Sequence, residues 1–213
     1  MNKQLKEYGD IWDRSKELLQ QGRSMDLIHT RISLDFALRL LEKLGGDPEI
    51  VIPAIMLHDI GNMMIRSDNL EQETIDPGTD SAKKVYSFSV KQKHLTEGAK
   101  LSRKILEELR YSEELIEAIV DIVGDHESVK GGPPEDRDNL NKIIVSDADK
   151  LYRYSANGFF AMCRVHDIRE EEMLSLNFQK MEEWLYTENA KKIAAEEMRK
   201  MPNAESIPQL VEI

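Results

Sequence analysis

The chain has 213 residues, of which 40% are hydrophobic and 32% are charged, a balance typical of a globular protein rather than a disordered or membrane-embedded one. Its formal net charge of −11 repels nucleic acid polymers and anionic membranes, whereas a small anionic substrate stays compatible with it, because a metal and local cations can reverse the field inside one pocket. Its length favours a single domain over 1–213. The single cysteine, the polar start and the lack of any apolar run near roughly 20 residues predict a cytoplasmic protein.

Apolar spacing predicts three helices in the first third of the chain. The first covers 10–19, and the second covers 24–44 and ends before a pair of glycines. Asp47 is a suitable N-cap and Pro48 a suitable first residue for the third helix, which runs to His58. Because this third helix is apolar nearly all round, we expect it to be central and buried.

The polar stretch 66–92 has no sustained period and is predicted to be a lid or long connection, a kind of segment that is often functional. Helical spacing resumes at 95–109, 112–123 and 140–154. The charged tail 169–200 predicts an amphipathic C-terminal helix that covers the core or a subunit interface, which leaves a homodimer open. No segment shows strand alternation, so the expected fold class is all-α.

Histidines and aspartates recur in or beside these predicted helices. His58 and Asp59 are adjacent at the end of the buried third helix, and they offer the nitrogen and oxygen donors that borderline divalent metals prefer. Carboxylates also interrupt the apolar residues around 146–150, where burial is costly unless they are paired or bound to metal. In chain order the candidate ligands are His29, His58, Asp59, His94, His126 and an aspartate at 147 or 149.

Three sequence pieces resemble the HD superfamily of metal-dependent hydrolases. They are LIHTRIS around His29, AIMLHDIG around His58 and Asp59, and SDADKLYRY around Asp149, and the likeness covers about 24–157. The resemblance implies an HD-domain-like helical bundle. It also implies hydrolysis of phosphomonoesters or phosphodiesters, often nucleotides, without naming the substrate.

The resemblance also implies a particular metal arrangement. Members that hold two metals use two further histidines, which would be His94 and His126 here. Two divalent ions are therefore expected, with iron, manganese or another transition metal as candidates and magnesium as a further one. Asp59 would bridge the ions and place the attacking water, which makes it the predicted catalytic residue. A single metal, with both further histidines contacting phosphate or supporting the metal ligands from behind, stays open.

The last ligand of the family usually follows a small or apolar residue. Asp149 follows Ala148, whereas Asp147 follows Ser146, so Asp149 is the predicted ligand. Their positions around the predicted helix do not show which aspartate is the ligand, because each lies to one side of the apolar stripe. Asp147 is then expected to orient a histidine or to cap the helix.

The chain departs from the family pattern at one position that bears on phosphate binding. Many relatives carry Lys three residues after the aspartate of the pair, where it contacts phosphate, and this chain has Asn62. The predicted substrate-binding cations are instead Arg66, Lys150 and Arg153. Cys163 lacks a neighbouring base, so no nucleophilic role is expected for it.

Two rival functions follow from the same residues. The four-histidine, two-aspartate set also resembles the di-iron oxygenases of this superfamily that cleave inositol or organophosphonates, and Asn62 in place of Lys favours them. A third hypothesis is a non-catalytic module that binds metal or nucleotide. The cyclic-dinucleotide phosphodiesterases are disfavoured because their GYP signature is missing.

Overall fold

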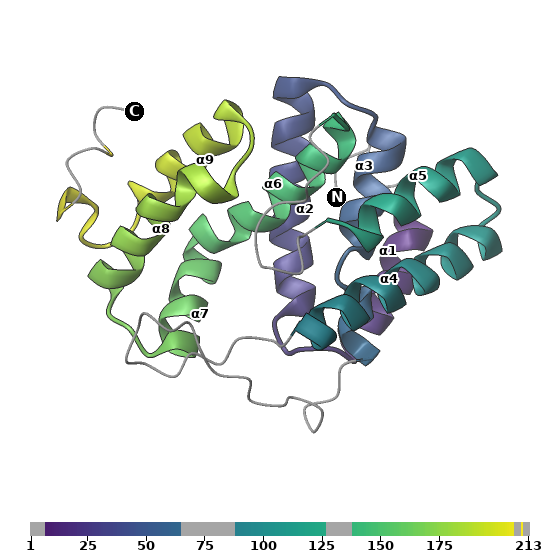
Figure 1. The fold of residues 1–213 in the computed structure, drawn as a ribbon, viewed down its shortest axis with the longest axis horizontal. Helices are drawn as coiled ribbons and strands as arrows, with labels where there is room; N and C mark the ends of the chain where they lie inside the picture. Colours follow the sequence, from purple (N-terminus) through teal and green to yellow (C-terminus); the bar gives the residue numbers. More distant parts are fainter. Residues whose placement is uncertain (1–6, 65–87, 127–137, 207–209, 211–213) are drawn as a thin grey trace.

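The computed structural model describes residues 7–64, 88–126, 138–206 and 210, and the elements within these ranges are all helical (Figure 1). The expected all-α fold class is therefore confirmed. The longer helices are α1 Gly9–Leu19, α2 Asp26–Leu44, α3 Pro48–Leu57, α4 Phe88–Glu108, α5 Glu113–Gly124, α6 Leu140–Leu151, α7 Ala156–His166, α8 Glu170–Trp184 and α9 Glu188–Met198. The short 3-10 helices are η2 Ile60–Met64, η4 Tyr152–Tyr154 and η5 Ala204–Ser206.

Helix α3 occupies the centre of the fold, as its apolar sequence predicts. Its residues from Val51 to Leu57 are all buried, and the helix packs against α1, α2, α5 and α6. The side chain of Asp47 accepts a hydrogen bond from the backbone N–H of Glu49 at 2.9 Å, and Pro48 follows as the first helical residue. The chain therefore leaves this buried helix at His58 and Asp59, deep inside the protein.

Two helix pairs lie around α3. Helices α2 and α6 pack against each other, and α4 packs against both α5 and η2 (Figure 1). The contact between η2 and α4 depends on Gly61, because a Cβ there would collide with the carbonyl oxygen of His94 and lie 2.7 Å from the amide nitrogen of Gly98. Glycine at this position lets the α4 backbone approach the residues that follow the His-Asp pair.

The C-terminal third differs in detail from the sequence-based expectation. The tail 169–200 forms two helices, α8 and α9, because the chain turns at Leu185 and Thr187 caps α9. Helix α7 lies in a stretch for which no helix was expected. Helix α4 begins at Phe88, inside the predicted lid or connection 66–92, and the part of that stretch before residue 88 lies outside the described residues. Within the described ranges, we find no helix with the length and apolar character needed to cross a membrane.

Candidate metal centre

The predicted ligands converge from five separate places in the fold. They arise on α2, directly after α3, on α4, two residues after α5, and on α6. Their donor atoms form two groups, and within each group the atoms lie within 4.8 Å of one another. The first group, called here the outer group, contains His29, His58 and Asp149, and the second, called the inner group, contains Asp59, His94 and His126.

In the outer group, two imidazole nitrogens and one carboxylate oxygen face a common point. His29 Nε2 lies 3.0 Å from His58 Nε2 and 3.0 Å from Asp149 Oδ1. The same Asp149 oxygen lies 3.6 Å from His58 Nε2. Tyr152 packs edge-on against the His29 ring with the centroids 4.4 Å apart, which restrains the orientation of that imidazole.

Asp59 lies between the two groups and turns one oxygen toward each. Its Oδ2 atom is 3.4 Å from His29 Nε2 and 3.7 Å from His58 Nε2, whereas Oδ1 is 3.4 Å from His94 Nε2. The His126 ring stands perpendicular to the rings of His58 and His94, with centroids 5.1 and 5.5 Å away. The inner and outer groups are thus neighbours that share the carboxylate of Asp59.

Backbone carbonyls fix two of the imidazoles. His58 Nδ1 lies 2.8 Å from the carbonyl oxygen of Ile55, and His126 Nδ1 lies 2.9 Å from that of Val123. Because a carbonyl oxygen accepts, each Nδ1 carries the hydrogen and donates it. In the neutral imidazole this leaves a lone pair on Nε2, which is the form that binds a metal.

The positive and negative groups of the cluster each favour the charged form of the other. Burial acts to raise the pKa of Asp59, but the positive charges of His58, Arg23, His29 and His94 outweigh it and hold this pKa well below its usual range. Burial likewise opposes ionisation of Asp149, and Lys150 and the two outer histidines lower its pKa. Burial lowers the pKa of His58, and the two carboxylates more than offset this and raise it to about 9.

This donor set fits a transition metal. Four imidazoles and two ionised carboxylates lie together in a buried place, where His58 is 0% and His126 1% exposed. Carboxylates and imidazoles of this kind suit iron, manganese or zinc, and cations offset the cost of burying them. The residues present therefore suit divalent metal binding, as the sequence led us to expect.

The family model described as HD domain matches residues 26–154, more than half of the chain. The chain belongs to the HD domain family. Members of this family are typically metal-dependent phosphohydrolases. Neither the curated proteins nor the solved structures contain a match to the chain.

The three predicted substrate-binding cations have different surroundings in this HD domain. Arg66 lies outside the described residues. Lys150 Nζ lies 2.7 Å from Asp149 Oδ2, so its charge faces the outer group. Arg153 donates to Asn177 Oδ1 at 2.9 Å and stacks 4.1 Å over the Trp184 ring, and burial lowers its pKa to about 10. Helix α8, rather than the ligand cluster, therefore holds Arg153.

A fourth cation, Arg23, was not predicted. Its Nη2 atom lies 3.1 Å from Asp59 Oδ2, and its Nε atom lies 2.6 Å from Asp26 Oδ1. Arg23 belongs to the short connection between α1 and α2, where no apolar period indicates what it faces. The one local signal is Asp26 three residues later, which is fully buried in the first turn of α2 and needs a partner.

Asp147 serves the C-terminal helices. Its Oδ1 accepts the backbone N–H of Tyr186 at 2.7 Å, and its Oδ2 accepts both the N–H and the hydroxyl of Thr187 at 3.0 and 2.7 Å. Burial raises the pKa of Asp147 to about 6, against the lowering effect of these hydrogen bonds. The carboxylate thus holds the start of α9, where the sequence left open a histidine partner or a helix cap.

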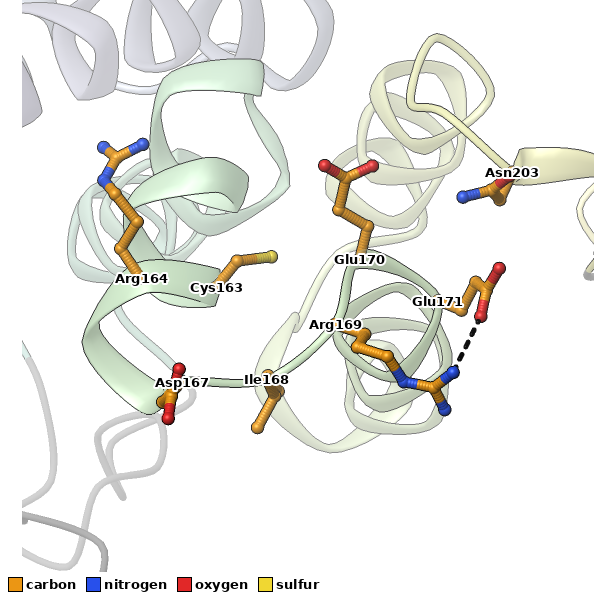
Figure 2. Close-up of a pocket in the computed structure, with 8 residues that line it drawn as sticks. All are labelled: Cys163, Arg164, Asp167, Ile168, Arg169, Glu170, Glu171 and Asn203. Atoms are coloured by element: carbon orange, nitrogen blue, oxygen red, sulfur yellow. Dashed lines mark ion pairs between the residues drawn. The ribbon is translucent and has the colours of Figure 1, made fainter.

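A surface pocket of about 560 Å³ lies at the junction of α7 and α8 (Figure 2). Figure 2 shows Cys163 and Glu170 on its opposite walls, and its lining includes none of the six clustered residues. Burial and the charge of Glu170 raise the pKa of Cys163, which disfavours the thiolate. This environment agrees with the expectation that Cys163 is not a nucleophile.

Proposed function

We propose that this HD domain hydrolyses a small phosphate ester or a nucleotide, using divalent metal held by the inner and outer groups. The observation that carries the proposal is the position of Asp59, whose two oxygens face different sets of imidazole nitrogens. A carboxylate placed in this way suits a bridge between two ions. The neighbouring outer and inner groups support two ions rather than one.

The proposed roles of the residues follow from their charge and position. Bound divalent metals lower the pKa of water toward neutrality and offset negative charge on phosphoryl oxygens. Asp59, ionised at neutral pH, would accept a hydrogen bond from the attacking water and orient it. His58 and His126 keep their Nε2 atoms directed into the cluster because their Nδ1 atoms are bound to carbonyls. Lys150 places a positive charge beside Asp149.

A di-iron oxygenase is the second candidate. Asn62, which stands where many relatives have a lysine, is 4% exposed, so a neutral amide occupies a buried place beside the metal-binding pair. Four imidazoles also suit iron. Oxygen consumption by iron-loaded protein in the presence of a polyol or a phosphonate, without phosphate release from esters, would favour this candidate over hydrolysis.

The test of the proposal is a panel of nucleotides and phosphomonoesters assayed for phosphate or pyrophosphate release after loading with manganese or iron. We expect metal-dependent turnover in the wild type and only background release in Asp59→Ala. Asp35→Ala is the matched control, because Asp35 is exposed on α2. Turnover that survives in Asp59→Ala would contradict the mechanism, and a wild type that binds metal but hydrolyses nothing would point to a non-catalytic module.

A further inference from the structure

Arg23 is held at one end by a buried carboxylate. Its backbone N–H donates to Asp26 Oδ2 at 2.7 Å, and its side-chain Nε donates to Asp26 Oδ1 at 2.6 Å. Asp26 is fully buried, so both of its oxygens are directed to this one residue in a place with little solvent. Gly22 makes room for the arrangement, because a Cβ there would lie 2.6 Å from Asp26 Oδ2.

The other end of the guanidinium reaches the ligand cluster. Arg23 Nη2 donates to Asp59 Oδ2 at 3.1 Å, and the same oxygen is 3.4 Å from His29 Nε2. The connection that carries Arg23 also lies against η2, since a Cβ on Gly22 would be 3.4 Å from Asn62 Cβ. The guanidinium therefore stands beside the outer group, and the backbone next to it lies against Asn62, where many relatives have a lysine.

Among the described cations that contact the cluster, Arg23 has the side chain most exposed to solvent. Its side chain is 39% exposed, compared with 14% for Lys150 and 6% for Asp59. Within the cluster itself the outer residues His29 and Asp149 are more exposed than Asp59. A molecule that enters from solvent on this side meets the guanidinium and the outer group together.

We propose that Arg23 binds the phosphoryl group of the substrate at the outer group, and that Asp26 is the residue that positions its guanidinium. The inference rests on the proposed function and names a residue for substrate binding. A guanidinium presents its N–H donors in a fixed plane that matches two phosphoryl oxygens, and it keeps its charge at any working pH. Because Asp26 fixes the Nε side, the Nη side is the one directed at the cluster.

The experiment measures binding of inorganic phosphate to the manganese-loaded full chain by calorimetry, so it needs no turnover. We expect Arg23→Ala to weaken phosphate binding about ten- to a hundredfold, the range for charged hydrogen bonds. Arg23→Lys keeps the positive charge but lacks the paired N–H donors of the guanidinium, so its phosphate affinity should fall less than that of Arg23→Ala. Asp26→Asn should also bind phosphate more weakly, although Arg23 itself is unchanged. Arg39→Ala is the matched control, since Arg39 is 37% exposed and pairs with Glu196 and Glu197.

The outcomes separate this inference from the proposed function. Unchanged phosphate affinity in Arg23→Ala, with full metal content by elemental analysis, would overturn the role of Arg23 even if the wild type hydrolyses esters. Loss of metal from both Arg23→Ala and Arg23→Lys would show that Arg23 acts by holding the Asp59 carboxylate in place for the metal, and would also overturn the proposed role. Phosphate binding that depends on Arg23 in a protein that hydrolyses nothing would support the inference and contradict the proposed function.

Discussion

Asp147 and Asp149 lie two residues apart on α6 and serve different parts of the fold. Asp149 Oδ1 lies 3.0 Å from His29 Nε2, whereas Asp147 accepts three hydrogen bonds from Tyr186 and Thr187 at the start of α9. Residues at this spacing point roughly 200° apart around a helix. One helix therefore contributes to the ligand cluster on one side and holds the C-terminal helices on the other.

Replacing each aspartate by asparagine should separate these two roles. Asp149→Asn should bind less metal, since it removes the charge of a proposed ligand. Asp147→Asn should keep its metal and lose about 1–3 kcal/mol of stability, because an amide NH₂ would face a backbone N–H donor. Elemental analysis after dialysis and urea unfolding measure the two effects. The reverse pattern, with metal lost only from Asp147→Asn, would contradict the assignment.

A methyl group at Gly61 should disturb the inner group. Its Cβ would collide with the carbonyl oxygen of His94, so α4 must move away from η2. We expect Gly61→Ala to lose about 1–3 kcal/mol of stability and to bind less metal. Gly98→Ala is the control across the same contact, because its Cβ would meet Val123 at an ordinary 3.5 Å. Gly98→Ala should be neutral or more stable by up to about 1 kcal/mol, and equal behaviour of the two variants would contradict the prediction.

Lys142 should support the position of His126. This lysine is buried at the start of α6, and its Nζ lies 3.0 Å from Asp121 Oδ2 and 3.1 Å from Asp125 Oδ2, directly before His126. Lys142→Met should weaken the binding of one metal equivalent by about tenfold. This is the low end of the range of affinity losses for residues that support a metal ligand without contacting the metal. Lys100→Met is the control, since that lysine pairs with Glu97 on the surface. Titration with manganese checks the result, and two unchanged binding constants would contradict it.

Tyr154 should make the fold sensitive to alkali. Its side chain is fully buried, its hydroxyl donates to the carbonyl oxygen of Asn177 at 3.2 Å, and burial raises its pKa above the ordinary 10.0. Above pH 10 the unfolded chain releases this proton and the folded protein keeps it, so stability falls by about 1.4 kcal/mol per pH unit from this group. Tyr154→Phe should cost about 1 kcal/mol at pH 8.

Urea unfolding at pH 8, 10 and 11 tests the alkaline prediction. The difference in stability between wild type and Tyr154→Phe should shrink as the pH rises above 10, because only the wild type carries this proton. A difference that stays constant over the series would show that the hydroxyl ionises equally in both states.

The helices around α3 could be predicted because local signals and burial agree there. Asp47, Pro48 and the apolar run mark α3, and Ser112 marks α5, where its hydroxyl accepts the N–H of Leu115. Helix α7 was missed because Gly158 weakens the local signal, although its lack of a side chain permits close contact with the Tyr152 carbonyl. Close packing of α7 against the turn that precedes it thus outweighs helix propensity there.

The division between α8 and α9 could not be read from the sequence either. Apolar spacing continues through Leu185, and the chain turns there because Asp147, some 40 residues earlier, binds the backbone of Tyr186 and Thr187. Arg23 was missed for a similar reason, since its partner Asp59 lies 36 residues away. The histidines could be picked out from the helical segments that carry them, and the family resemblance selected Asp149 over Asp147. Contacts between residues far apart in the chain, such as those of Arg23, cannot be read from a local sequence pattern.

The carbonyl contacts of His58 and His126 have a consequence for how metal enters and leaves. Both rings are oriented by the ends of their own helices, and α2 and α6, which carry the proposed ligands His29 and Asp149, pack on each other directly. The apoprotein should therefore keep its native helices, unlike domains that fold only around their ion. We therefore expect one ion to replace another in the folded state, at a rate set by dissociation of the metal from its ligands rather than by unfolding.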